Sequence, residues 1–581
     1  VDPVAGLALT LTVELLAGGV LRTNASLTNT GAEPYQLDEL VLALPVPATA
    51  SELLEFAGRW AKERVPQRRA FTVGTHLREG RRGRTGADAA TVLHAGVPGF
   101  GFARGDVWGV HVGWSGNHVH YAARANTGHR LLGGGELLLP GELRLAGGES
   151  YTSPWLYGSF GDGLDAVARR FHRYLRARPG HPSIERPVTL NVWEAVYFDH
   201  SLPVLLDLAE KAAAVGVERF VLDDGWFGSR RDDTSGLGDW VVSDAAWPDG
   251  LHPLVTRVRA LGMQFGLWFE PEMVNPDSDL ARAHPEWILA TGGRLPIESR
   301  HQQVLNLADA DCYAHLKEAM SAVIDDYAID YLKWDHNRDL IDAGSQPSGG
   351  PAVHAQTLAA YRLMAELKAF HPGLEIESCS SGGARVDLGV MQHADRVWVS
   401  DCIDPHERQS MMRWTTQLLP PELLGSHIAS ATSHTTGRSH SLAFRAGTAL
   451  FGHLGIEWDL RQASDADLAA LTEWIGFHKG LRPLLFGGDL VRIDTSDAAI
   501  VAGGVVAPDR SRALFSVAAL DSLDVVLPGR LPLPGLDADR RYRVAPVLLG
   551  GGGGGVLPPP WWGLRGDLHE LLDDVSHGRP P

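Results

Sequence analysis

The sequence predicts a multidomain protein of α/β and β class, in which a central (β/α)8 TIM barrel is flanked by an N-terminal and a C-terminal antiparallel β-sandwich. Three observations predict this arrangement. Short strands of period two fill roughly the first 155 residues. Eight candidate strands that alternate with helical segments follow over about 300 residues. Strands and turns return beyond about residue 485.

The N-terminal strands show the alternation of a half-buried sheet. From Leu7 to Leu15 every second residue is large and apolar, and Ala, Thr or Glu stands between. This is the period of a strand with one face on a core. Gly, Asn and Pro separate it from similar segments, which predicts an antiparallel sandwich over residues 1–155. The other candidate strands are Leu21–Thr28, Tyr35–Leu44, Val107–Trp114, His118–Arg124 and Gly135–Leu145.

Two features of this region carry charged or metal-binding side chains. The segment Arg64–Arg84 is rich in arginine and poor in apolar residues, so a solvated loop is the plainer interpretation. The alternative is a segment that reaches the catalytic site of its own or a neighbouring subunit. His118 and His120 form an HxH pair, but a strand would place both on one face beside Tyr121, which favours a structural role over a metal site.

The centre of the chain alternates strands with helices. An amphipathic helix over Gly163–Arg178 forms a connecting segment, residues 156–184. Eight βα units then favour a closed barrel over residues 185–484, because doubly wound sheets usually have fewer strands. The candidate strands are Val188–Trp193, Arg219–Asp223, Gln264–Phe269, Ile329–Trp334, Leu374–Glu377, Arg396–Ser400, Leu424–Ile428 and Gly452–Ile456. The candidate helices are Pro203–Val215, Leu251–Leu261, Ala310–Tyr327, Val353–Phe370, Pro405–Leu418 and Leu442–Phe451.

The C-terminal part, residues 485–581, reads as a second β-sandwich. Its glycine run, Gly550–Gly555, predicts a flexible surface loop, because each glycine loses much backbone entropy on ordering. The candidate strands are Leu490–Ile493, Ala498–Val506, Arg512–Val517 and Arg541–Leu549.

Composition narrows the possible functions. The formal charge of −18 argues against nucleic-acid and anionic-membrane partners, which need an excess of Lys and Arg. Three cysteines without a CxxC pair argue against a disulfide scaffold or structural zinc. Without a signal peptide or an apolar run of roughly 18 to 20 residues, the expectation is a soluble cytoplasmic protein. Because the chain opens on Val-Asp-Pro without Met, we expect an incomplete N-terminus.

Polar residues of one kind collect where six of the candidate barrel strands end. A lone Asp at such a position is usually a helix N-cap or part of an ion pair. Recurrence on several strands weakens that explanation, and carboxylates mixed with tryptophans suit a sugar, whose hydroxyls and C–H faces they bind. The residues are Trp193, Glu194, Asp223, Asp224, Trp226, Trp268, Glu270, Glu272, Lys333, Asp335, Glu377, Ser378, Cys379, Ser380 and Asp401.

Asp335 and Asp401 are the candidate catalytic pair. Glycoside hydrolysis needs one carboxylate that attacks or activates water and one that protonates the leaving oxygen. The two residues follow different strands, so a barrel can hold them about 5 to 5.5 Å apart, as in retaining enzymes. The charge of Lys333 would keep Asp335 ionised as a nucleophile, whereas Asp401 would need a raised pKa.

Metal and cofactor chemistry find little support in the sequence. His336, His427 and His434 lie near strand ends, but no HxH or HExxH pair occurs there. No GxSxG elbow, Walker loop or GxGxxG turn follows a strand. The sequence therefore predicts neither a catalytic metal nor a cofactor.

At these strand ends the sequence resembles the α-galactosidases of glycoside hydrolase family 36. The resemblance extends from about residue 6 through the barrel and fades in the C-terminal part. The matching segments are LDDGWF (Leu222–Phe227), GLWFEPEMVNPDSDL (Gly266–Leu280), LKWDHNRD (Leu332–Asp339), ESCSSGGARVDLG (Glu377–Gly389) and WVSDCID (Trp398–Asp404).

The resemblance implies a retaining exo-α-galactosidase that hydrolyses small galacto-oligosaccharides such as melibiose, raffinose and stachyose. It implies Asp335 as nucleophile and Asp401 as acid/base, with Asp404 as the rival for the second role. By the same resemblance, Asp223 and Asp224 would bind the 4- and 6-hydroxyls of the sugar, and Lys333 would bind its 3- and 4-hydroxyls. Cys379 with Gly382 would lie near the 2-hydroxyl, where the thiol would exclude an N-acetyl group. The other implied substrate contacts are Trp268 beside the ring, Arg300, and Trp193 at the pocket edge.

The resemblance also bears on assembly and on alternatives. The family's N-terminal β-supersandwich is normally longer than the segment before this barrel, which agrees with an incomplete N-terminus. Related members form tetramers whose N-terminal domain touches a neighbour's site, so a homo-oligomer is expected. An α-galactosyl transferase or transglycosylase resembling raffinose synthase would share both aspartates. A catalytically silent galactoside-binding protein is a further alternative, although the presence of both aspartates argues against it.

Overall fold

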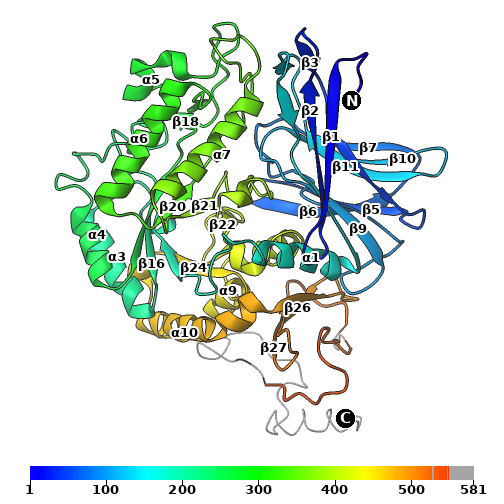
Figure 1. The fold of residues 1–581 in the computed structure, drawn as a ribbon. Coiled ribbons are helices and arrows are strands. Elements are labelled where there is room, and N and C mark those ends of the chain that lie inside the picture. The colour runs from blue at the N-terminus through cyan, green and yellow to red at the C-terminus, as the bar shows by residue number, and fades with distance from the viewer. Residues whose placement is uncertain (526–528, 546, 548–581) are drawn as a thin grey trace.

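A closed eight-stranded parallel barrel lies at the centre of the computed structural model, as predicted (Figure 1). The structure describes residues 1–525, 529–545 and 547. Every predicted barrel strand is present, and the strands follow one another around the barrel in chain order. They are β15 (Thr189–Asn191), β16 (Arg219–Leu222), β17 (Gln264–Phe269), β20 (Tyr331–Trp334), β21 (Glu375–Ser378), β22 (Arg396–Trp398), β23 (Leu424–Ala429) and β24 (His453–Glu457).

Helices pack around the barrel, and their limits follow from local sequence. Helix α6 begins after Asp309, whose side chain accepts the N–H groups of Asp311 and Cys312. It ends at Tyr327, and Ala328 follows it in a left-handed conformation. The long helices are α3 (Leu202–Val215), α4 (His252–Ala260), α6 (Ala310–Tyr327), α7 (Val353–Phe370), α8 (Pro405–Thr415), α9 (Leu442–Ala449) and α10 (Asp465–Gly487). Short elements are α2 (Trp193–Val196), α5 (Asp279–Ala283), β18 (Met273–Val274), β19 (Gln303–Val304) and the 3-10 turns η1 (Pro285–Trp287), η2 (Val390–Gln392), η3 (Pro421–Leu423) and η4 (Leu460–Gln462).

Two facing sheets form the N-terminal sandwich. Their shared core contains Leu93 and Val110 from the larger sheet and Ala122 and Leu132 from the smaller one. The larger sheet contains β1 (Leu7–Leu15), β2 (Leu21–Asn29), β14 (Leu156–Asp162), β9 (Asp106–Val112), β8 (Leu93–Gly96), β5 (Glu52–Arg59) and β6 (Lys62–Ala70), with β13 (Ser150–Thr152) also on β2. The smaller contains β4 (Leu42–Val46), β11 (Arg130–Glu136), β10 (His118–Arg124) and β7 (Gly74–Gly80), and β3 (Tyr35–Leu37) pairs separately with β12 (Leu143–Leu145).

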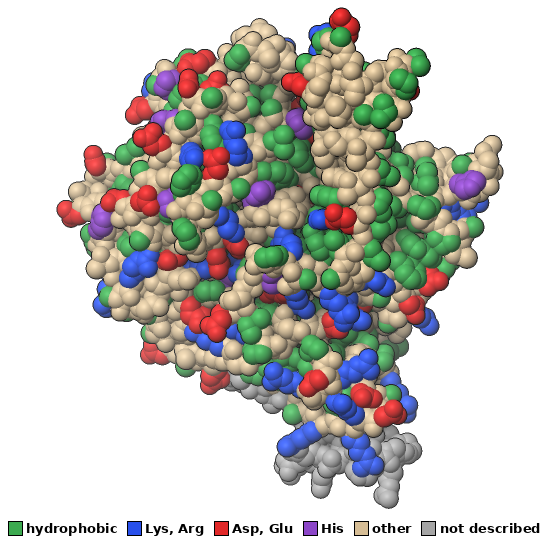
Figure 2. Space-filling model, in the orientation of Figure 1, with side chains coloured by type: hydrophobic (Ala, Val, Ile, Leu, Met, Phe, Trp, Pro, Cys, Tyr) green, Lys and Arg blue, Asp and Glu red, His purple; other side chains and the backbone are tan. Residues whose placement is uncertain are grey.

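Three expectations for this sandwich need correction. The predicted strands Tyr35–Leu44 and Gly135–Leu145 are each interrupted and contribute to two different sheets. The second break contains Gly141, whose positive φ of 78° makes a turn. The alternating apolar face of β1 is not buried, because Leu9, Leu11 and Val13 are 54%, 57% and 57% exposed. Figure 2 shows apolar side chains on the surface over the N-terminal sheets, at the right of the view.

The arginine-rich segment Arg64–Arg84 is not a solvated loop. It forms most of β6 and β7, and Arg64 and Arg84 are buried. Arg64 Nη2 donates to the carbonyl of Gly383 (2.7 Å), and Arg84 Nη1 donates to the carbonyl of His336 (2.7 Å). This segment thus reaches the end of the barrel within one chain, in line with the alternative interpretation, and its contact with a catalytic site stays a prediction. His118 and His120 are buried, with Nδ1 of His118 near the Gly116 carbonyl and Nε2 of His120 accepting from Val112.

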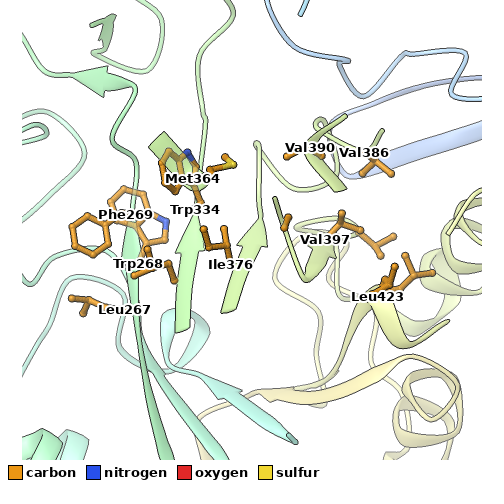
Figure 3. Packing of buried hydrophobic residues seen from close by; sticks show 14 of the residues in the cluster. Leu267, Trp268, Phe269, Trp334, Met364, Ile376, Val386, Val390, Val397 and Leu423 are labelled. Atoms are coloured by element: carbon orange, nitrogen blue, oxygen red, sulfur yellow. The ribbon is translucent and has the colours of Figure 1, made fainter. Parts of the chain in front are cut away.

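Helix α1 (Leu164–Arg176) joins the sandwich to the barrel, as the amphipathic pattern predicts. Its residues Val167, Phe171 and Leu175 belong to one continuous core with the barrel. Arg176 also pairs with the buried Glu422 at 2.6 Å. Figure 3 shows the barrel part of this core, where Trp268 and Phe269 of β17 lie near Trp334 of β20 and Ile376 of β21.

A three-stranded antiparallel sheet follows α10. Its strands β25 (Asp489–Ile493), β26 (Ile500–Val506) and β27 (Ala513–Ala519) confirm three of the four predicted C-terminal strands. Residues 541–545 and 547 are not in a strand, and the rest of the predicted segment Arg541–Leu549 lies outside the described residues, as does Gly550–Gly555.

We propose the division 1–155, 156–184, 185–484 and 485–581 as the domain organisation. In the described part of the chain, no helix combines the length and apolar character needed to cross a membrane.

Candidate active site

A cavity of about 610 Å³ opens where the barrel strands end. This is the end at which TIM barrels carry their active sites. Eight of the ten predicted site residues line it: Trp193, Asp223, Asp224, Trp268, Arg300, Lys333, Asp335 and Asp401. The structure therefore brings together residues that are up to 208 positions apart in the sequence, and it places both candidate catalytic aspartates in one cavity.

Asp335 is held as an ionised carboxylate directly after β20. Its Oδ1 accepts the backbone N–H groups of His336 (2.8 Å) and Ser381 (3.3 Å). Its Oδ2 accepts Nδ2 of Asn337 (2.8 Å) and Nε1 of Trp268 (3.3 Å). Burial raises the pKa of Asp335, but the charge of Lys333 and the bonds from Asn337 and His336 outweigh burial and hold the pKa below its usual value.

For Asp401, the effects that raise the pKa exceed those that lower it. Nε1 of Trp60 donates to its Oδ2 at 2.7 Å, and Nε1 of Trp398 donates to its Oδ1 at 3.1 Å. Burial, followed by the negative charge of Asp335, raises the pKa of Asp401 above its usual value despite the bond from Trp60. The environment thus separates the pKa values of the two aspartates, the arrangement that assigns one carboxyl as a base or nucleophile and the other as an acid.

Asp404, the rival for the acid role, has a structural environment. It caps α8 by accepting the N–H of His406 (2.8 Å), and it accepts the hydroxyl of Thr436 (2.5 Å) and Nη1 of Arg438 (2.9 Å). Burial raises its pKa, but these bonds hold the pKa below the usual value. Asp404 does not line the cavity.

The adjacent carboxylates Asp223 and Asp224 are each paired with a different cation. Nζ of Lys333 and Nδ2 of Asn191 both lie 2.7 Å from Oδ2 of Asp223. Asp224 accepts two nitrogens of Arg230, at 3.0 and 2.8 Å. Burial still raises the pKa of Asp224, ahead of the opposing charge of Arg230. Lys333 and Arg230 thus both reduce the repulsion between the two carboxylates at this strand end.

Aromatic side chains and Arg300 complete the predicted set. Trp268 is buried and lies parallel to Phe227, at an interplanar angle of 5°. Trp193 begins α2 and makes an edge-on contact with Tyr197. Arg300 lies at a positive φ of 55° in an exposed loop. Its charge helps to lower the pKa of Asp335 and partly offsets the rise for Asp401.

Cys379 and Gly382 do not line the cavity. Cys379 is buried in a small cluster with Trp398, Ile403 and Ala429. A Cβ on Gly382, at φ 74°, would lie 2.7 Å from the backbone nitrogen of Asp401, so only glycine allows this close approach. Ser381 lines the cavity in their place. A role for the Cys379 thiol against N-acetyl groups stays a prediction.

Sequence reasoning missed several residues that line the cavity. Asn337 lies within LKWDHNRD and Arg84 within the arginine-rich segment, so the sequence contained a pattern that could have pointed to each of them. Glu457 directly follows a predicted apolar strand, the same signal that marked Asp335. Trp60 lies in the N-terminal sandwich, and no sequence pattern pointed to it as a site residue. The missed residues are Trp60, Arg84, Tyr197, Phe198, Arg230, Asn337, Ser381, Trp398, His434 and Glu457.

Two of the three histidines near the strand ends lie close to carboxylates. Nδ1 of His434 lies 3.2 Å from Glu194, and Nδ1 of His427 lies 3.1 Å from Glu457. Among the residues with a described placement, no group of three or more His, Cys, Asp or Glu is arranged to hold a metal ion.

Comparisons with known proteins agree over most of the chain. A family model described as melibiase matches residues 150–488, and one described as the glycosyl hydrolase family 36 N-terminal domain matches residues 1–146. An α-galactosidase from Escherichia coli is 41% identical over 547 residues, which cover 94% of this chain and 77% of the relative. The α-galactosidase AgaA from Geobacillus stearothermophilus is 32% identical, over 90% of this chain and 73% of the relative.

Solved structures give the same result. The crystal structure of the GH36 α-galactosidase AgaA superposes with a TM-score of 0.87 at 32% identity, covering 93% of this chain and 76% of that chain. A variant of AgaA in complex with stachyose also gives a TM-score of 0.87, at 31% identity, over 95% of this chain and 78% of that one.

Proposed function

The chain belongs to glycoside hydrolase family 36, and from this premise we propose that it is an α-galactosidase that hydrolyses terminal α-D-galactosyl residues of small galacto-oligosaccharides. Raffinose and stachyose, the sugars in complexes of the AgaA variants, are the first substrates to examine, together with melibiose. The observation that carries the proposal is the single cavity with two aspartates whose pKa values move in opposite directions.

The proposed reaction is a double displacement with retention. Asp335 attacks the anomeric carbon while Asp401 donates its proton to the glycosidic oxygen, so the C–O bond breaks and the leaving sugar departs as an alcohol. A covalent β-galactosyl-enzyme remains. Asp401, now ionised, removes a proton from water, whose oxygen attacks the same carbon and releases α-galactose and free Asp335. Lys333, Asp223 and Asp224 bind the ring hydroxyls.

Turnover assays distinguish this proposal from its alternatives. The wild-type protein is expected to release p-nitrophenol from p-nitrophenyl α-galactoside and galactose from melibiose and raffinose. Galactose binding without turnover would indicate a silent binding protein. Galactosyl transfer to sugar acceptors in preference to water would indicate a transferase.

The indole N–H of Trp60 provides a test of the acid role of Asp401. Activity requires Asp335 ionised and Asp401 protonated, so the acid limb of kcat/KM follows Asp335 and the alkaline limb follows Asp401. Because the Trp60 bond stabilises the ionised form and lowers the pKa of Asp401, Trp60→Phe is expected to move the alkaline limb to higher pH. Trp108→Phe, which removes an indole stacked on Phe160 outside the cavity, is the control. A limb that stays in place or moves down in Trp60→Phe would contradict this role.

We also propose that the protein is a cytoplasmic homo-oligomer, with a tetramer as the implied state. The exposed apolar row of β1, an edge strand, supports association through the N-terminal sandwich. Leu11→Lys combined with Val13→Lys is expected to shift the protein toward the monomer in sedimentation velocity. Val517→Lys on β27, an equally exposed position (58%), is the matched control. A monomeric wild type, or an unchanged state in the double variant, would refute this interface.

A further inference from the structure

Glu457 is a buried carboxyl group in the cavity that the reaction described above does not use. It is the last residue of β24, is 4% exposed and lines the cavity. Because it belongs to the barrel strand itself, it lies at the floor of the site, as Lys333 of β20 does. Among the residues that the structure describes, no cation is bonded to Glu457, and a carboxyl group buried in this way needs hydrogen-bond partners.

One oxygen of Glu457 is held from behind by a chain of buried side chains. Nη2 of Arg396 lies 2.9 Å from Nε2 of His427. Because arginine only donates, Nε2 of His427 accepts, and the imidazole proton is on Nδ1. Nδ1 therefore donates to Oε2 of Glu457, at 3.1 Å. Arg396 is itself fixed by an ion pair with Glu377. The orientation of the Glu457 carboxyl is thus set by the protein.

The other oxygen of Glu457 distinguishes it from the aspartates of the cavity. Both carboxylate oxygens of Asp223, Asp224, Asp335 and Asp401 accept hydrogen bonds from the protein. For Oε1 of Glu457, the described residues provide no hydrogen-bond partner, while the residue faces the cavity. Oε1 is therefore a preoriented acceptor with an open position on the cavity side.

Glu457 lines the same cavity as Lys333, Asp223 and Asp401. Burial raises the pKa of Glu457 to about 7, with Lys333 opposing and Asp223 and Asp401 adding to the rise. These are the groups between which the sugar ring must lie if Asp401 is to protonate its glycosidic oxygen.

Resting on the α-galactosidase function proposed above, we propose that Glu457 is a specificity-determining residue that binds one hydroxyl group of the galactosyl ring through Oε1. His427 and Arg396 are its positioning residues. A hydroxyl group fits this position because it donates to the open oxygen and is small and uncharged. A sugar that lacks this hydroxyl leaves Oε1 of the buried carboxyl without a hydrogen bond and is disfavoured for that reason.

The test compares Glu457 variants on a panel of p-nitrophenyl α-galactosides, each lacking the 2-, 3-, 4- or 6-hydroxyl. Glu457→Leu is expected to lower kcat/KM on the full galactoside by about 10- to 100-fold, the effect of one hydrogen bond to a charged group. On one deoxy substrate the loss should nearly vanish, because the hydroxyl that Glu457 binds is already missing. Equal losses on all substrates would show a structural role and overturn the proposal, as would no loss on any.

Three further variants keep the result interpretable. Glu457→Gln retains the shape of the side chain and an acceptor for His427. It is expected to show the same pattern of kcat/KM across the deoxy substrates, with a smaller loss. This variant therefore tests the proposal even if Glu457→Leu does not fold. His427→Phe should weaken the same discrimination. Glu210→Gln, at an exposed position on α3, is the control, and it should leave kcat/KM unchanged on every substrate of the panel. A wild type without any turnover would instead refute the α-galactosidase function, so the two failures are distinct.

Discussion

Asp335→Ala is expected to lower kcat on p-nitrophenyl α-galactoside by on the order of 10⁴-fold or more, the scale on which loss of a nucleophile is felt in hydrolases. The loss is large because the variant lacks the oxygen that attacks the anomeric carbon, and neighbouring carboxylates of the cavity are held in other contacts. Asp223 and Asp224 are each bonded to a cation. The good nitrophenolate leaving group needs little acid assistance, so this substrate isolates the nucleophile.

Azide tests the same assignment by its product. In Asp335→Ala the shortened side chain leaves room on the face from which the nucleophile attacks, and azide can enter there. One displacement inverts the anomeric centre, so the expected product is β-galactosyl azide. NMR of the isolated product identifies the anomer. A variant that retains its rate, or that yields the α-azide, would remove Asp335 as the nucleophile.

The barrel could be predicted because its strands are buried on both faces. Strands such as Phe265–Phe269 read as short apolar runs, and polar residues follow directly where each strand meets the cavity. The pattern fixes the number and order of strands, and with them the part of the site that the strand ends carry. It does not fix how far a strand continues: β15 ends at Asn191, and the chain turns into α2 at Trp193, where a strand was predicted.

Contacts from the N-terminal sandwich could not be predicted in the same way. Trp60 is 341 residues away from Asp401 in sequence, and no local pattern links them. Arg84 shares this difficulty, because its partners lie far away in sequence at the barrel end: the carbonyl of His336, the hydroxyl of Ser380 and the carboxylate of Asp339. An arginine-rich segment resembles a solvated loop until the acceptors that bury it are known. For β1 the sequence wrongly predicted a buried apolar face. Alternation alone does not reveal whether a face of a strand has a packing partner.

Burial acts on both aspartates alike, and their neighbours decide the outcome. Asp335 accepts four hydrogen bonds and lies near Lys333, which together overcome the cost of burying its charge. Asp401 accepts two indole N–H groups, and the charge of Asp335 adds to the effect of burial. An ionised Asp335 thus contributes to the raised pKa of Asp401 in the free enzyme. Once Asp335 forms an ester with the sugar, its charge is lost, and the pKa of Asp401 should fall, which suits its second role as base.

Asp401→Ala is expected to lower kcat/KM on melibiose by about 10²- to 10⁴-fold, the usual contribution of a positioned acid. Because nitrophenolate leaves without a proton, galactosylation by p-nitrophenyl α-galactoside should suffer less, and hydrolysis of the galactosyl-enzyme should become limiting. Azide needs no base, so it should restore turnover. It attacks the covalent intermediate from the face that water uses, and the expected product is α-galactosyl azide.

Asp404→Asn is the matched control for this experiment. The asparagine keeps an oxygen to cap α8, so the fold should be maintained while the carboxylate is lost. We expect Asp404→Asn to hydrolyse melibiose near the wild-type rate and to gain nothing from azide. Azide rescue in Asp404→Asn, with none in Asp401→Ala, would transfer the acid/base role to Asp404. Such a result would also require the loop after β22 to rearrange, because Asp404 is turned toward Thr436 and Arg438 and away from the cavity.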